Sequence, residues 1–106
     1  MKKEPKLYLK YIFDECEYLL ERIKNISYKD FIENPDLRRS FIRSIEIIGE
    51  SARNLPNDFK ELYSEISWID IIDMRNKLIH EYFGVDLKLV WETVHKDILI
   101  LKKNID

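Results

Sequence analysis

The chain has 106 residues, of which 45% are hydrophobic and 36% are charged, with only two glycines and three prolines. This length allows one hydrophobic core but not two independent ones, and the composition favours a helix-rich globular protein over a disordered chain or a β-sandwich. The formal net charge of −2 argues against a protein that coats nucleic acid, because such binding needs clustered Lys and Arg. We expect a single all-α domain over residues 1–106, with any RNA contact local or shared between subunits.

The location of the protein is predicted from its cysteine content and its apolar runs. The lone cysteine, Cys16, cannot form an internal disulfide, and the N-terminus begins with a charged stretch rather than an apolar signal core. The longest apolar run, residues 98–101, is far shorter than the ~20 residues that a bilayer span requires. We therefore expect a cytoplasmic protein with no membrane anchor.

The first half of the chain predicts two long helices separated by a short one. Apolar residues recur at helical spacing between charged residues over 7–23. Ser27 is placed to cap a short helical turn, and Pro35 occupies a first helical position, where the missing N–H is tolerated. A second long helix then covers about residues 36–55, until Pro56 ends it.

The second half predicts two more amphipathic helices after a connector. Asn57 is placed to cap a short helix within the connector. Ser67 and Asp70 have the form of a capping box and open the next helix, which Gly84 closes. Asp86 then caps a last helix. Four amphipathic helices with short connections favour an antiparallel four-helix bundle with one or two additional short helices.

The segment at residues 75–82 places a fixed cation, a side chain that titrates near neutral pH and a phenol close together in sequence. When RNA is cut without metal, a base deprotonates the 2′-hydroxyl, an acid protonates the departing 5′-oxygen, and a cation stabilises the phosphate charge. Arg75 can bind the phosphate and His80 can serve as acid or base. On spacing alone, however, a histidine at a helix end more often interacts with carbonyls and the helix dipole.

Helix geometry restricts how this segment can form a site. At 3.6 residues per turn, Tyr82 lies roughly 20° around the helix from Arg75, whereas His80 is offset by about 140°. One straight helix therefore does not easily bring all three together. Either the helix frays before Gly84 and turns His80 around, or the same segment of a second subunit completes the site across a two-fold axis.

Three stretches occur together in this chain. They are Gly-Glu-Ser-Ala at residues 49–52, a segment at 68–82 that ends in Met-Arg-Asn-Lys-Leu-Ile-His-Glu-Tyr, and Leu-Val-Trp at 89–91. In this combination the chain resembles the HepT-like family of the HEPN superfamily. The resemblance implies an all-α bundle, a homodimer with a cleft between its two motif helices, and a metal-independent endoribonuclease that needs no cofactor. It assigns RNA cleavage to Arg75 and His80.

The same resemblance implies a partner protein. HepT-like proteins are toxins of type II toxin–antitoxin systems and are paired with a minimal nucleotidyltransferase antitoxin, which transfers AMP from ATP to the motif tyrosine, here Tyr82. A negatively charged adenylate beside the cleft would repel RNA phosphate and block the site. This implies silencing by covalent modification.

Further residues are candidates for supporting roles. Asn76 follows the motif arginine and can orient Arg75 or the phosphate, although a merely local hydrogen bond is equally compatible. Glu50 and Asp73 can each orient Arg75 through a charge-assisted hydrogen bond. Three arginines on one helix can provide a local basic surface, or they can be solvated or paired between subunits: Arg38, Arg39 and Arg43.

Two other functions remain open from the sequence. One is a non-catalytic HEPN dimer that binds a nucleotide or a nucleotidyltransferase partner without cutting RNA. The other is a helical assembly subunit in which the motif pairs two protomers through Arg75 and Tyr82.

Overall fold

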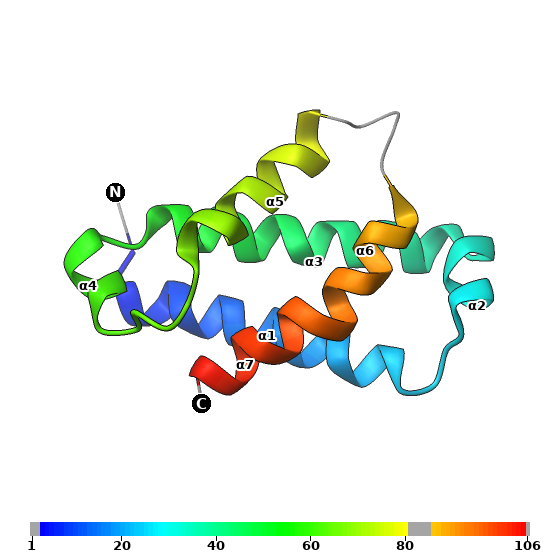
Figure 1. Cartoon of the computed structure of the whole chain (residues 1–106), viewed down its shortest axis with the longest axis horizontal. Coiled ribbons are helices and arrows are strands. Elements are labelled where there is room, and N and C mark those ends of the chain that lie inside the picture. The colour runs from blue at the N-terminus through cyan, green and yellow to red at the C-terminus, as the bar shows by residue number, and fades with distance from the viewer. Residues whose placement is uncertain (1–2, 81–85, 106) are drawn as a thin grey trace.

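The computed structural model describes residues 3–80 and 86–105, except for the side chains of 78–80, and these residues form helices with short connections and no strand (Figure 1). The all-α prediction is confirmed. In chain order the elements are α1 (Pro5–Ile23), α2 (Tyr28–Glu33), α3 (Pro35–Asn54), α4 (Asn57–Glu61), α5 (Trp68–His80), α6 (Leu87–Thr93), the π-helical segment η2 (Val94–Ile98) and α7 (Leu99–Ile105).

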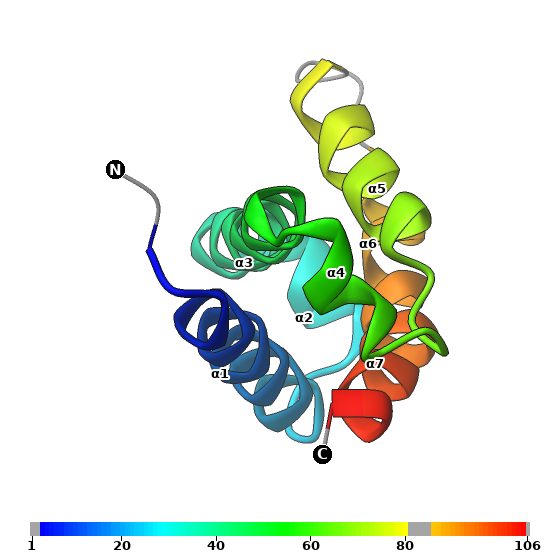
Figure 2. The ribbon, with the colours of Figure 1, turned by 90° about the vertical axis from the view of Figure 1, so that its left-hand side faces the viewer.

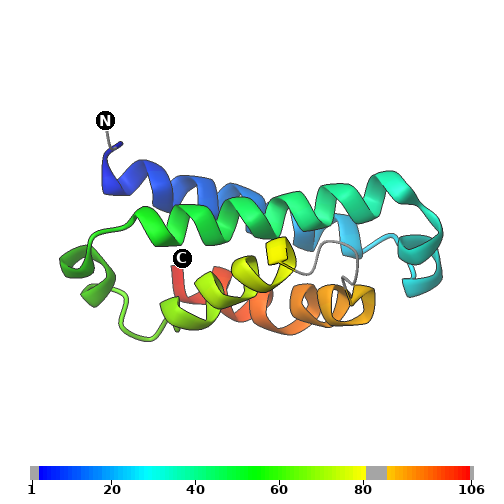
Figure 3. The same ribbon diagram turned by 90° about the horizontal axis from the view of Figure 1, so that it is seen from above.

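The long helices run antiparallel to their neighbours, as predicted for a four-helix bundle. α3 packs against α1 and α5, and the C-terminal helix, which consists of α6, η2 and α7, packs mainly against α1 (Figure 1). In the view along the bundle, α5 and the C-terminal helix lie on the same side of α3 (Figure 2). Figure 3 shows the same arrangement from above, with α1 on the opposite side of α3. Among these helices, α5 packs mainly against α3.

Local side-chain chemistry sets the ends of α2 and α3. Ser27 Oγ accepts from the backbone N–H of Asp30, whose carboxylate accepts from the backbone N–H of Ser27, so a complete capping box starts α2. These hydrogen bonds to the charged form lower the pKa of Asp30. Asn34 Oδ1 accepts from two backbone N–H groups at the start of α3, and Pro35 is its first residue. The predicted roles of Ser27 and Pro35 are confirmed.

The second half of the chain follows its predicted boundaries less closely. Asp86 Oδ1 accepts from a backbone N–H in the first turn of α6, which confirms this residue as a cap. The prediction that Asn57 caps α4 is wrong, because Asn57 is its first helical residue and Pro56 holds the cap position without a side-chain hydrogen bond. Ser67, which precedes α5, donates from Oγ to Oδ2 of Asp70 in the first turn of that helix, at 2.6 Å. Gly84 lies outside the described residues.

The core occupies the space between α1, α3 and the C-terminal helix. The Phe31 ring packs with its centroid 5.1 Å from that of Phe41 and 5.4 Å from that of Trp91, and full burial of such side chains contributes about 1.5–3 kcal/mol each. The largest fully buried side chains are Phe31, Phe41, Ile12, Leu19, Ile48, Val90, Val94 and Cys16. In the part of the chain that the structure describes, no helix has the length and apolar character needed to cross a lipid bilayer.

Candidate functional site

The candidate site begins where α3 and α5 approach each other at Gly49. A Cβ atom built on Gly49 would lie 2.1 Å from Cβ and 2.6 Å from Cγ of Arg75, far inside van der Waals contact. Only a residue without a Cβ fits at this position while the two helices keep their spacing. The contact fixes where the Arg75 side chain leaves α5.

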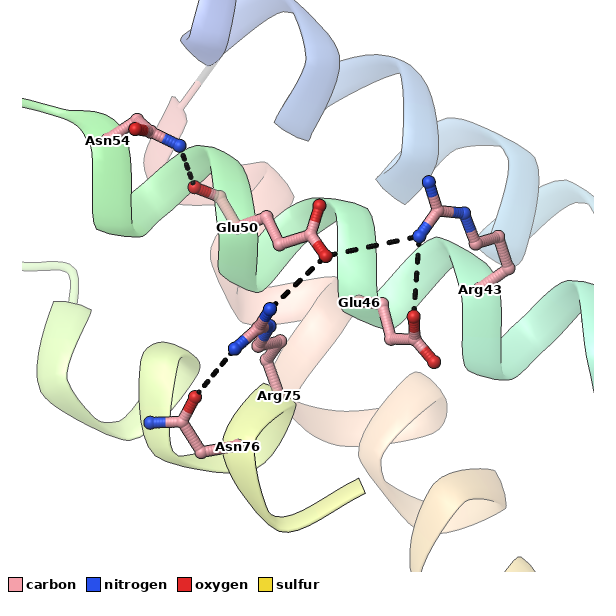
Figure 4. Close-up of polar contacts among 6 residues, drawn as sticks. All are labelled: Arg43, Glu46, Glu50, Asn54, Arg75 and Asn76. Carbon is pink, nitrogen blue, oxygen red and sulfur yellow. Dashed lines mark hydrogen bonds and ion pairs between the residues drawn. The ribbon is translucent and has the colours of Figure 1, made fainter. Parts of the chain in front are cut away.

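The guanidinium of Arg75 then lies along α3. The Arg75 side chain is only 18% exposed, and its Nη2 is 3.3 Å from Glu50 Oε1, which makes a charge-assisted hydrogen bond (Figure 4). Nη1 donates to Asn76 Oδ1 at 3.0 Å. The Glu50 carboxylate on α3 and the Asn76 amide on α5 therefore hold the two terminal nitrogens of the guanidinium in place.

Glu50 also connects this arginine to a second one. Arg43 Nη1 is 3.3 Å from Glu46 Oε2 and 4.0 Å from Glu50 Oε1, the same oxygen that contacts Arg75 (Figure 4). The Asn54 side chain donates to the backbone carbonyl of Glu50 at 2.8 Å. One carboxylate oxygen is thus shared by two guanidinium groups, one from α3 and one from α5.

One donor of Arg75 remains unused. Its Nε is buried and has no hydrogen-bond partner among the described residues. A buried N–H without an acceptor is costly. An unpaired Nε within an otherwise ordered guanidinium is therefore unusual in a purely structural ion pair. An anion with several oxygens, such as a phosphodiester, offers acceptors to the terminal nitrogens of the guanidinium, whereas the buried Nε is closed to it.

The predicted supporting residues have different surroundings. Asn76 and Glu50 both contact Arg75, as described above. Asp73 is exposed, and two residues of helix place it about 200° around α5 from Arg75. Among the described residues, its carboxylate has no hydrogen bond or ion pair with the guanidinium.

The other predicted catalytic and regulatory residues lie at the end of α5. His80 is the last residue of that helix, but its side chain lies outside the described residues. Tyr82 also lies outside them. The assignment of Arg75 and His80 to catalysis and of Tyr82 to modification stays a prediction.

The predicted basic surface on α3 is partly used within the chain. Arg38 donates to the backbone carbonyl of Ile32, and Arg43 pairs with Glu46. Arg39 is exposed. No cluster of three or more His, Cys, Asp or Glu side chains suited to a metal ion occurs in the described part of the chain.

The packing role of Gly49 is what sequence reasoning missed, although residues 49–52 belong to the motif. The available signal was a glycine inside a long helical pattern, where it costs ~1 kcal/mol relative to alanine and so needs a packing reason. The packing reason is the Cβ of Arg75. The residue that faces Gly49 is visible only in the tertiary structure.

Comparisons with known proteins agree with the motif. A family model described as "Ribonuclease HepT-like" matches residues 12–106. The chain is 52% identical to "Putative RNase TTE0752" of Caldanaerobacter subterraneus, over 97% of this chain and 92% of that protein. It is 45% identical to "Probable ribonuclease HepT" of Thermococcus cleftensis, over 96% of this chain and 93% of that protein. No solved structure matches the chain significantly.

Proposed function

The chain belongs to the ribonuclease HepT-like family, and we propose that it is the toxin of a type II toxin–antitoxin system, a metal-independent endoribonuclease of the cytoplasm. The observation that supports the proposal most is the placement of Arg75. Its side chain is mostly buried, and its guanidinium is oriented by Glu50 and Asn76. Such a preorganised cation stabilises charge that develops on a phosphate in the transition state.

In the proposed reaction, Arg75 binds the scissile phosphate and His80 transfers protons. The 2′-oxygen loses its proton to a base and forms a bond to phosphorus, while the bond from phosphorus to the 5′-oxygen breaks and an acid protonates that oxygen. The products are a 2′,3′-cyclic phosphate and a free 5′-hydroxyl. Two proton-transfer groups are needed, one to accept and one to donate.

A homodimer supplies both groups. α5 is helical as far as His80, so the backbone positions of Arg75 and His80 keep their offset of about 140° around the helix. This geometry supports a site completed by a second subunit across a two-fold axis, which brings two copies of His80 to one cleft. One histidine then acts as base and the other as acid.

We assign silencing of the site to Tyr82 and a minimal nucleotidyltransferase antitoxin. The phenol oxygen of Tyr82 attacks the α-phosphorus of ATP, pyrophosphate leaves, and the phenol proton passes to a base of the partner enzyme. The new phosphodiester adds negative charge two residues after His80, where it repels an incoming RNA phosphate.

The test is RNA cleavage by the purified, unmodified protein in the presence of EDTA. We expect His80→Ala and Arg75→Ala to abolish cleavage. Two matched variants should keep it: His95→Ala, which removes the other histidine, and Arg53→Ala, which removes an exposed arginine on α3. Equal cleavage by wild type and His80→Ala, or loss of wild-type cleavage in EDTA, would contradict the proposal.

Modification is tested separately with the partner enzyme and ATP. We expect the intact mass of the wild type to increase by AMP units, Tyr82→Phe to stay unmodified, and the matched Tyr28→Phe to behave as wild type. AMP transfer to Tyr82 in a protein that cuts no RNA would favour the non-catalytic, nucleotide-binding dimer instead.

A further inference from the structure

A cleft of about 370 Å³ lies between α3, α5 and the C-terminal helix. Its lining is largely aliphatic and comes from all three helices: Ile48 from α3, Ile71 and Met74 from α5, and Ile98 and Ile100 from η2 and α7. Ile100 is 57% exposed, so apolar surface continues from the cleft to its outer edge. A cavity of this size and character is typical of a binding site.

The charged side chains that line the cleft are all acidic. Glu65, Asp70 and Asp97 line it and are exposed, and the described lining residues include no Lys, Arg or His. In the described part of the chain, neither Glu65 nor Asp97 forms an ion pair. Carboxylates beside an apolar, low-dielectric wall attract cations more strongly than carboxylates on an open surface. The same charges repel RNA phosphate.

A buried hydroxyl adds a third feature. Thr93 lines the cleft and is only 4% exposed, and its Oγ1 has no hydrogen-bond partner among the described residues. Thr hydroxyls within helices commonly donate to a carbonyl one turn earlier, and this one does not. Thr93 immediately precedes η2, and π-helical turns are frequent at functional sites. The hydroxyl therefore keeps an unsatisfied hydrogen-bonding capacity at the wall of the cleft.

We propose that this cleft binds a basic, amphipathic segment of a partner protein. Aliphatic side chains of the segment insert between α5 and the C-terminal helix, and a Lys or Arg side chain beside them pairs with the carboxylates. A polar group of the segment bonds to Thr93 Oγ1. A protein segment fits better than a small molecule because the apolar surface extends beyond the cleft over Ile100. The binding requires neither Arg75 nor His80, so its test can succeed or fail separately from the test of the proposed ribonuclease function.

The probe is a labelled helical peptide of about 18 residues made of leucine and lysine, with leucines at the spacing of one helix face. A second peptide carries glutamate in place of every lysine, and a third is a scrambled version of the first. Binding to the full chain is measured by fluorescence anisotropy. We expect the basic amphipathic peptide to bind at least about tenfold more tightly than the other two.

Two pairs of matched variants locate the binding site. Asp97→Lys lies in the cleft, and Glu92→Lys makes the same change of charge at an exposed position of the same helix outside it. Ile100→Ser removes a lining side chain, and Leu99→Ser removes its exposed neighbour, which does not line the cleft. We expect the cleft variants to weaken binding about tenfold or more and the controls to leave it within about twofold. All four side chains are exposed, so the fold should persist.

Three outcomes would overturn the proposal. The first is no binding of the basic peptide, or equal binding of the acidic one. The second is equal weakening by the cleft variants and their controls. The third is a change of oligomeric state, measured by sedimentation, in Ile100→Ser but not in Leu99→Ser. The cleft would then be an interface between copies of this chain.

Discussion

Gly49→Ala is the substitution whose effect the structure predicts most directly. The added Cβ would lie 2.1 Å from Cβ of Arg75, whereas ordinary contacts begin at 3.4 Å, so α3 and α5 must separate locally by more than 1 Å. Neither atom is the end of a flexible side chain, and no rotamer change relieves the contact. Overpacking of this kind costs typically ~1–3 kcal/mol.

The expected sign differs from that of a glycine in an unconstrained helix. There, replacement by alanine stabilises by ~1 kcal/mol, because alanine restricts the unfolded chain and favours helix. Here the overpacking outweighs this gain, and we expect a net destabilisation of about 1–2 kcal/mol. The measurement is urea unfolding followed by circular dichroism at several protein concentrations, since dimerisation would make stability depend on concentration.

Arg75→Gly provides the matched background, because it removes both atoms that the new Cβ would meet. In that background, Gly49→Ala should be neutral or stabilising. The double-mutant cycle should therefore show a coupling energy of about 2 kcal/mol between the two positions. If Gly49→Ala stabilises both backgrounds equally, the close approach of α3 and α5 at this point is refuted.

Three further outcomes follow from individual contacts. Thr93→Val should raise the free energy of unfolding by about 1 kcal/mol in denaturant titrations, because it replaces a buried hydroxyl without a partner by a methyl group of similar shape, and Thr93→Ser should not. Glu50→Gln should lower kcat for RNA by about 10- to 100-fold with little change in KM, because it weakens the orientation of Arg75, whereas Glu46→Gln should change neither. The pKa of Asp30 is lowered in the folded state, so its contribution to stability is complete above the unfolded pKa and is lost as pH falls through the folded one. In acid unfolding curves, Asp30→Asn should not show this loss of stability as the pH falls.

The ends of the helices were largely predictable, because their causes are local in sequence. Ser27 with Asp30, Pro35 and Asp86 act on backbone groups within three residues, and each acts as the sequence indicates. Asn57 is the exception. Pro56 adopts the extended conformation of a cap residue, so the helix starts at Asn57, one position earlier than predicted.

The candidate site was predictable only as a set of residue types. Arg75, Glu50 and Asn76 were identified from the motif and its neighbours, but Glu50 and Arg75 are 25 residues apart, and their contact depends on how α3 and α5 pack. The sharing of Glu50 with Arg43 and the role of Gly49 arise from that same packing. The π-helical turn η2 was not predicted either, because its residues have the same apolar pattern as an α-helix.

The two proposals meet in α5, because neighbouring positions on this helix serve both of them. Arg75 lies against Gly49 at less than an ordinary contact distance for a Cβ, and Ile71 and Met74, which lie about 40° and 100° around the helix from Arg75, line the cleft. A partner segment seated in the cleft would therefore press on a helix that cannot move toward α3. The remaining freedom of α5 is to slide or rotate along α3, and either motion changes the distance between Arg75 and Glu50. If a segment binds in the cleft, we therefore expect it to change the orientation of the Arg75 guanidinium through α5.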